Sequence, residues 1–134
     1  MASCIRIALA LSLALTAASG EELRSRIGLM ALYDFNESQG TDIKDVAGVG
    51  APLDLEIEKI TQVTRQKGAL KVTARATIKS KKPAARFQAA VKRTGELTLE
   101  TWVEPANLKQ SGPARIVTLS KDGINRNLTL GQEG

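Results

Sequence analysis

The sequence predicts an all-β protein, an antiparallel β-sandwich or jelly roll with one short helix. Three observations predict it: stretches in which apolar and polar residues alternate, turn-rich segments between them, and a single Ala-rich stretch that begins with a proline. Strict alternation is typical of antiparallel strands with one buried face, whereas strands of a parallel sheet are apolar on both faces. The length of 134 residues allows one domain at most.

The first 20 residues are predicted to be an export signal. Arg6 precedes the apolar run 7–18, and small residues follow it before an acidic pair. This order is typical of a secretory signal peptide, and a membrane anchor would need about 20 apolar residues. We therefore expect residues 1–20 to be removed and residues 21–134 to form the domain. The protein is then exported to a periplasm, a cell surface or the extracellular space, without a membrane span.

The composition excludes several kinds of site. The sequence has no His and a single Cys, Cys4, which lies in the predicted signal. This excludes Ser-His-Asp and Cys-His catalysis, His-ligated zinc and an intrachain disulfide. Because small secreted eukaryotic domains are commonly rich in disulfides, an exported domain without cysteine favours a bacterial envelope protein.

Three strands are expected before the helix. Residues 29–35 form an apolar run after a glycine, and residues 53–58 alternate apolar residues with acids. The clearest alternation covers residues 70–78, which we expect to form one continuous strand. Glycine-rich turns are predicted at residues 36–40 and 45–50.

The Ala-rich stretch 83–93 predicts the helix. Pro83 suits a first turn, Lys92 and Arg93 complement the C-terminal dipole, and Gly95 lies just past the end. Its apolar face is expected to pack on the sheet through Phe87, Ala90 and Val91.

Three further strands are expected after the helix. Residues 97–103 alternate until Pro105 stops them, and residues 114–120 are apolar enough for a central strand. Residues 127–130 begin another strand after a turn at 121–123.

Several of these segments resemble laminin-G-like jelly-roll domains of the concanavalin A-like superfamily. The segments are GLMALYDFNESQG at 28–40, DIKDVAGVG at 42–50, GELTLETWVEPANLKQSGPARIVTLS at 95–120 and NLTLGQEG at 127–134. The resemblance implies a sandwich fold and a non-catalytic binding or adhesion module, with a glycan as the ligand class. Members of this family are longer, so we expect this chain to be the N-terminal half of such a domain, an incomplete sandwich.

The resemblance also implies candidate ligand sites. Trp102, flanked by Glu100 and Glu104, forms a candidate platform for stacking a sugar, although the family's Trp more often packs in the core. Calcium is common in the family and is bound by loop oxygens. The candidate calcium ligands are Asp122, Asn125 and Asn127, or Asp42 and Asp45.

A basic block, residues 59–93, supports a second hypothesis for the function. It contains no acid, because none occurs between Glu58 and Glu96. Such a block can bind a polyanion such as an acidic polysaccharide, or it can be a solvated sheet face whose lysines prevent edge pairing. Nucleic acid is not expected, because the chain is exported and the block has one aromatic residue. The candidate polyanion-binding residues are Lys79, Lys81, Lys82 and Arg86.

A glycoside hydrolase is the enzymatic alternative. Retaining glycosidases use two carboxyl groups about 5–5.5 Å apart, and acids recur at Asp54, Glu56 and Glu58 and at Glu100 and Glu104. The motif of glucanases with this fold is incomplete here, because Lys59 stands where a third acid would be. We therefore expect no catalytic residue; a hydrolase fragment, or a fragment with no independent function, is the alternative.

Overall fold

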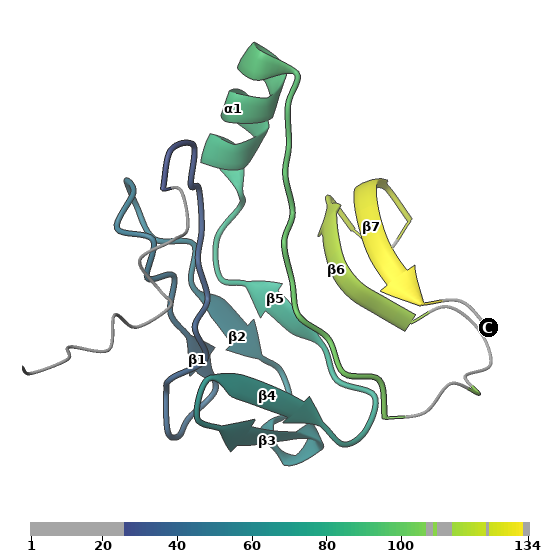
Figure 1. Cartoon of the computed structure of the whole chain (residues 1–134). Helices are drawn as coiled ribbons and strands as arrows, with labels where there is room; N and C mark the ends of the chain where they lie inside the picture. The colour runs from purple at the N-terminus through teal and green to yellow at the C-terminus, as the bar shows by residue number, and fades with distance from the viewer. Residues whose placement is uncertain (1–25, 107–108, 110–113, 123, 133–134) are drawn as a thin grey trace, which may run out of the picture. The chain divides into compact units, whose positions relative to one another are not determined.

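The computed structural model describes residues 26–106, 109, 114–122 and 124–132 (Figure 1). They belong to two compact units, one that ends at Gly95 and one that begins at Glu96. Within the described residues every strand pair is antiparallel and one α-helix is present, which confirms a strand-rich protein with one short helix. The predicted signal, residues 1–20, lies outside the described residues. None of the described helices has the length and apolar character needed to cross a membrane.

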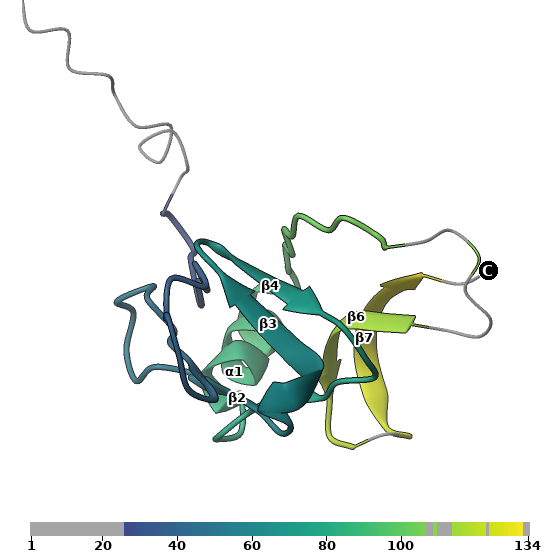
Figure 2. The same cartoon turned by 90° about the horizontal axis from the view of Figure 1, so that it is seen from below.

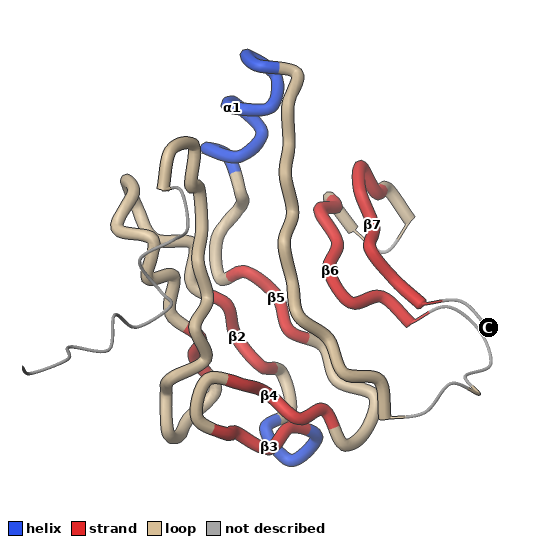
Figure 3. The backbone as a smooth tube through the Cα atoms, in the orientation of Figure 1, coloured by secondary structure: helices blue, strands red, loops and turns tan. Residues whose placement is uncertain are grey.

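Two small sheets make up the first unit. The first sheet has the order β1-β2-β5, with β1 at Asp42–Ile43, β2 at Leu55–Ile57 and β5 at Ile78–Ser80. The second is the hairpin of β3 (Val63–Gln66) and β4 (Ala69–Val72), whose strands lie side by side in Figure 2. A single 3₁₀ turn, η2 (Ile60–Gln62), connects β2 to β3. Figure 3 shows that loops make up most of the remaining chain of this unit.

The core of the first unit is small and lies where its strands meet. Ile43 of β1, Ile57 of β2 and Val63 of β3 are buried and form one cluster. The alternation predicted for residues 53–58 explains this, because Ile57 points inward while Glu56 and Glu58 lie on the other face. The partly buried residues that pack against the cluster are Tyr33, Phe35, Leu55, Leu70, Ala76 and Ile78.

The single strand predicted over residues 70–78 is two strands. β4 ends at Val72, β5 begins at Ile78, and the chain between them bends. The backbone N–H of Thr73 still donates to Gln62 on the β3 side, whereas the carbonyl of Thr77 accepts from Glu58 at the end of β2. The chain therefore changes partner from β3 to β2 here, and one straight strand cannot pair with both.

The strand predicted over residues 29–35 is wrong. The N–H of Leu32 donates to the Asp45 carboxylate, and its carbonyl accepts from the N–H of Val46, so its partners lie in a loop and not in a strand. Phe35 takes φ 54°, in the left-handed region, which ends the extended backbone. The apolar residues of the run are still used, because Tyr33 and Phe35 pack against the core.

The helix prediction is confirmed. α1 spans Ala85–Thr94 and ends at Gly95, which takes φ 72° and donates its N–H to the carbonyl of Val91. A residue with a side chain is disfavoured in this left-handed conformation, so the glycine defines the end of the helix. Lys92 and Arg93 occupy the last turn as predicted. The three residues of the predicted apolar face, Phe87, Ala90 and Val91, are partly buried.

The second unit contains one two-stranded antiparallel sheet. β6 (Ala114–Ser120) and β7 (Arg126–Gln132) agree with two of the strands predicted for this region. The prediction of a central position for residues 114–120 is wrong, since β6 has β7 as its only strand neighbour in the described chain. The third predicted strand, residues 97–103, lies outside every described strand, because alternation yields a strand only where a neighbouring strand supplies backbone partners.

Candidate functional site

A buried carboxylate joins three segments of the first unit. The Asp45 side chain is 1% exposed and accepts backbone N–H donors from Leu32 at 3.1 Å, Ala47 at 3.1 Å and Leu53 at 3.0 Å. The guanidinium of Arg86, on α1, forms an ion pair with the same carboxylate. Because Asp45 and Arg86 are 41 residues apart, this pair ties the helix to the loops around β1 and β2.

The same contacts stabilise the charged form of Asp45. Burial acts to raise the pKa of Asp45, but the N–H donors of Leu53, Ala47 and Leu32 and the Arg86 guanidinium outweigh it and hold that pKa below its ordinary value. The carboxylate is therefore ionised at neutral pH and serves as an acceptor at the centre of the loops.

Tyr33 bonds to the same loop as Asp45. Its hydroxyl donates to the carbonyl of Leu53 at 2.7 Å. Burial, and then the negative charge of Asp45, raise the pKa of Tyr33 to about 12. The phenol therefore remains a protonated donor near neutral pH.

Acid is expected to weaken the fold through Asp45. The pKa of Asp45 is lower in the folded chain than in the unfolded chain, where it is about 3.9. The ionised carboxylate therefore stabilises the fold fully at a pH above its pKa in the unfolded chain, and this stabilisation is lost as the pH falls through its pKa in the folded chain. The difference in free energy of unfolding between the full chain and an Asp45→Asn variant should therefore shrink between pH 7 and pH 3 in urea melts. The other carboxylates titrate alike in both proteins, so an unchanged difference would contradict the assignment.

The structure divides the basic block into two groups of cations. In the first group each cation binds a carboxylate: Arg65 pairs with Glu37, Lys79 with Glu58, Lys81 with Asp42, and Arg86 with Asp45. The second group is exposed and makes no ion pair within the described residues. Its members are Lys59, Lys67, Lys71, Arg75, Lys82, Lys92 and Arg93.

The predicted polyanion-binding residues fall into both groups. Lys79, Lys81 and Arg86 are engaged by carboxylates of the fold, so a ligand would have to displace a partner to bind them. Lys82 alone of the predicted four is exposed without an ion pair in the described chain. The sequence could not show this, because each partner lies at least 21 residues away.

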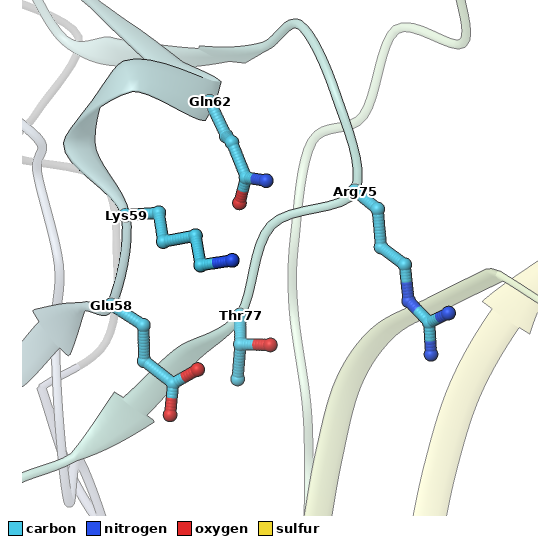
Figure 4. A pocket seen from close by; sticks show the side chains of 5 residues that line it. All are labelled: Glu58, Lys59, Gln62, Arg75 and Thr77. Atoms are coloured by element: carbon cyan, nitrogen blue, oxygen red, sulfur yellow. The ribbon is translucent and has the colours of Figure 1, made fainter.

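Two cations of the second group line a polar pocket, the anion pocket (Figure 4). Lys59 lies two residues after the end of β2, and Arg75 lies in the bend between β4 and β5. The pocket has a volume of about 230 Å³, below the range usual for drug-sized ligands. The residues that line it are Glu58, Lys59, Gln62, Arg75 and Thr77.

The geometry of the anion pocket follows from the backbone around it. The backbone N–H of Glu58 donates to the carbonyl of Thr77 at 3.0 Å. The backbone N–H of Gln62 donates to the carbonyl of Lys59, also at 3.0 Å. In Figure 4 the Lys59 ammonium and the Gln62 amide extend into the same space, and Arg75 flanks it beyond Thr77. The Glu58 carboxylate in this pocket is ion-paired with Lys79 at 2.7 Å, and this bond lowers the pKa of Glu58.

Sequence reasoning missed Lys59 and Arg75 as a pair. It treated Lys59 as the first residue of the basic block and as a departure from an acidic motif, and it placed Arg75 inside a continuous strand. A signal was available, since a cation that follows the end of a strand lies in a loop, where binding groups are common.

The residues of the candidate glycan platform lie outside the strands. Trp102, Glu100 and Glu104 belong to the segment between Gly95 and Ala106 and are exposed. The expectation that Trp102 packs in the core is wrong, because its side chain is 68% exposed. An exposed indole remains able to stack on a sugar ring.

The candidate calcium ligands serve other purposes. The carboxylate of Asp122 accepts the N–H of Ile124 at 2.8 Å, the N–H of Asn125 at 2.7 Å and the side-chain amide of Asn125 at 2.7 Å, and these bonds lower the pKa of Asp122. Asn127 lies on β7. Asp42 binds Lys44 and Lys81, and Asp45 is buried as described above. Among the described residues no group of three or more acidic, Cys or His side chains could hold a metal ion.

Two of the acids considered for hydrolysis lie beside lysines. Asp54 binds Lys44 at 2.9 Å and accepts the backbone N–H of Asp45, and these contacts lower the pKa of Asp54. Glu56 lies opposite Lys79 in the register of β2 and β5.

Comparison with known proteins finds no matching family model, no similar curated protein and no similar solved structure.

Proposed function

We propose that this chain is a non-catalytic binding module whose ligand is an acidic glycan. The observation that carries the proposal is the anion pocket, in which Lys59 and Arg75 face a small polar space without an ion-pair partner in the described chain. The other exposed cations of the basic block add to the positive charge of the first unit, and the whole chain carries a net charge of +5.

The physical basis is charge attraction combined with a few polar contacts. A cluster of one sign of charge raises the local concentration of an oppositely charged polymer and accelerates its association. Within the pocket, Gln62 and Thr77 supply an amide and a hydroxyl that can bond sugar hydroxyl groups. The resemblance to laminin-G-like jelly rolls supports a glycan as the polymer, and the antiparallel sheets are compatible with a sandwich of that family.

The proposal predicts salt-dependent retention on heparin. The full chain should elute at a defined salt concentration, and the double variant Lys59→Gln, Arg75→Gln should elute markedly earlier, because each lost contact reduces the salt dependence of binding by about one unit of slope. The matched control is Arg115→Gln with Lys121→Gln, which removes the same charge from the second unit.

Two outcomes would contradict the proposal. Equal shifts in the test and control variants would mean that only net charge matters and that the pocket is not the site. Binding to neutral glycans that ignores salt and is lost in Trp102→Ala would instead support the sugar-stacking platform, which the exposure of Trp102 favours as a second candidate.

A further inference from the structure

We propose that Glu58 makes the anion pocket selective for acidic sugars whose hydroxyl groups are free, such as uronic acids, over the same sugars carrying sulfate esters. This inference rests on the proposed function, because it concerns the same pocket and names the class of glycan that the pocket binds. The pocket is lined by one carboxylate, that of Glu58, together with the cations of Lys59 and Arg75. A ligand that offers only negative charge therefore matches only part of this lining.

The Glu58 carboxylate is ionised and has unused acceptor positions. Its Oε1 atom accepts from the Lys79 ammonium at 2.7 Å, and this bond, with the neighbouring Thr77 hydroxyl, lowers the pKa of Glu58. A carboxylate has about four acceptor positions on its two oxygens, so these contacts leave room for a further donor. The side chain is 40% exposed, which makes the carboxylate accessible to a ligand. Glu58 can therefore accept a hydrogen bond from a ligand but cannot donate one to it.

The backbone holds Glu58 beside the two cations. Glu58 comes directly before Lys59, and its backbone N–H donates to the carbonyl of Thr77, two residues after Arg75. In Figure 4 the Glu58 carboxylate and the Lys59 ammonium extend from the same stretch of chain toward Thr77. A ligand whose acid group binds the cations therefore brings its neighbouring groups close to Glu58.

Sulfation changes the groups that Glu58 meets. A sugar hydroxyl can donate a hydrogen bond to the carboxylate, and a bond to a charged acceptor is stronger than one to a neutral acceptor. A sulfate ester replaces this donor with a negative charge that has only acceptor oxygens, and two like charges at close range repel each other. Lys59 and Arg75 attract both forms of the sugar, so they provide affinity while Glu58 discriminates between the forms. The selected class is an acidic glycan with few or no sulfate groups.

A matched pair of ligands tests the selectivity. Trigalacturonate carries carboxylates and free hydroxyl groups, and its sulfated derivative has the same sugar chain with more negative charge. If charge alone governed binding, the sulfated form would be favoured by a similar factor in the full chain and in a Glu58→Gln variant. We expect instead that Glu58→Gln changes the ratio of the two dissociation constants by about tenfold in favour of the sulfated form, the equivalent of one hydrogen bond to a charged group. Calorimetry at fixed ionic strength measures both constants.

Two further variants separate Glu58 from its surroundings. Glu56→Gln removes the same charge two residues earlier, opposite Lys79 in the register and outside the set of residues that line the pocket, so the ratio should stay that of the full chain. Glu58→Gln also releases Lys79 from its ion pair. The double variant Glu58→Gln, Lys79→Gln removes that cation as well, and it should keep the altered ratio.

The outcomes distinguish this inference from the proposed function. A full chain that is retained on heparin through Lys59 and Arg75 but binds neither trisaccharide would overturn the selectivity alone. A ratio that Glu58→Gln leaves unchanged, that Glu56→Gln changes equally, or that the double variant restores would do the same. Heparin retention that does not depend on Lys59 and Arg75 would overturn both the selectivity and the proposed function.

Discussion

Replacing Asp45 with Ala is expected to lower the free energy of unfolding by about 3–5 kcal/mol, as is found when one partner of a buried ion pair is removed. The reason is specific to this carboxylate, which is 1% exposed and satisfies three backbone N–H groups in addition to Arg86. Its loss leaves these donors and the guanidinium without their acceptor in a partly buried region. Urea denaturation of the full chain, followed by circular dichroism, measures the effect.

Two variants separate this effect from a general loss of charge. Asp42→Ala removes an exposed carboxylate that pairs with Lys44 and Lys81 at the surface, and it should cost far less, because exposed ion pairs contribute little. Arg86→Ala should fall between the two, since Asp45 would keep its three N–H donors. A loss for Asp45→Ala no larger than that for Asp42→Ala would mean that the buried carboxylate does not hold the loops together.

Replacing Ile57 with Ala is the second change with a large expected effect, about 2–5 kcal/mol of unfolding free energy. Ile57 is 1% exposed and belongs to a core cluster whose other buried members within the described residues are Ile43 and Val63. The removed atoms leave a cavity that so few neighbours cannot fill. The same urea melt measures it.

The matched control removes the same atoms from the surface. Ile27 lies in the same unit and is 95% exposed, so Ile27→Ala should change the free energy of unfolding by no more than about 0.5 kcal/mol. If the two variants melted alike, the described core would contribute little to stability, and the stability of the chain would have to come from elsewhere.

The division of the basic block changes how its charge is interpreted. Some of its cations are components of the fold, and mutating them would damage stability and binding together. Lys59 and Arg75 are exposed, so their replacement tests binding with little effect on the core. The acid-linked melt and the heparin column therefore examine two separate features of the molecule.

Local patterns in the sequence determined the elements whose signals are short-range. The helix, its end at Gly95, the inward direction of Ile57, and the two strands after residue 113 follow from periodicity, from the conformational freedom of glycine and from β-propensity. These depend on neighbours a few residues away, which the sequence displays directly.

Only the tertiary structure decided which segments find partners. Residues 29–35 and 97–103 have the composition of strands but lie outside every described strand, and residues 70–78 divide where the chain changes partner from β3 to β2. The same holds for charge: a carboxylate 41 residues away engages Arg86, whereas no acid of the described chain forms an ion pair with Arg75. Backbone pairing and ion pairing are contacts between distant segments, so alternation and a run of cations specify what a residue can do, and the fold selects its partner.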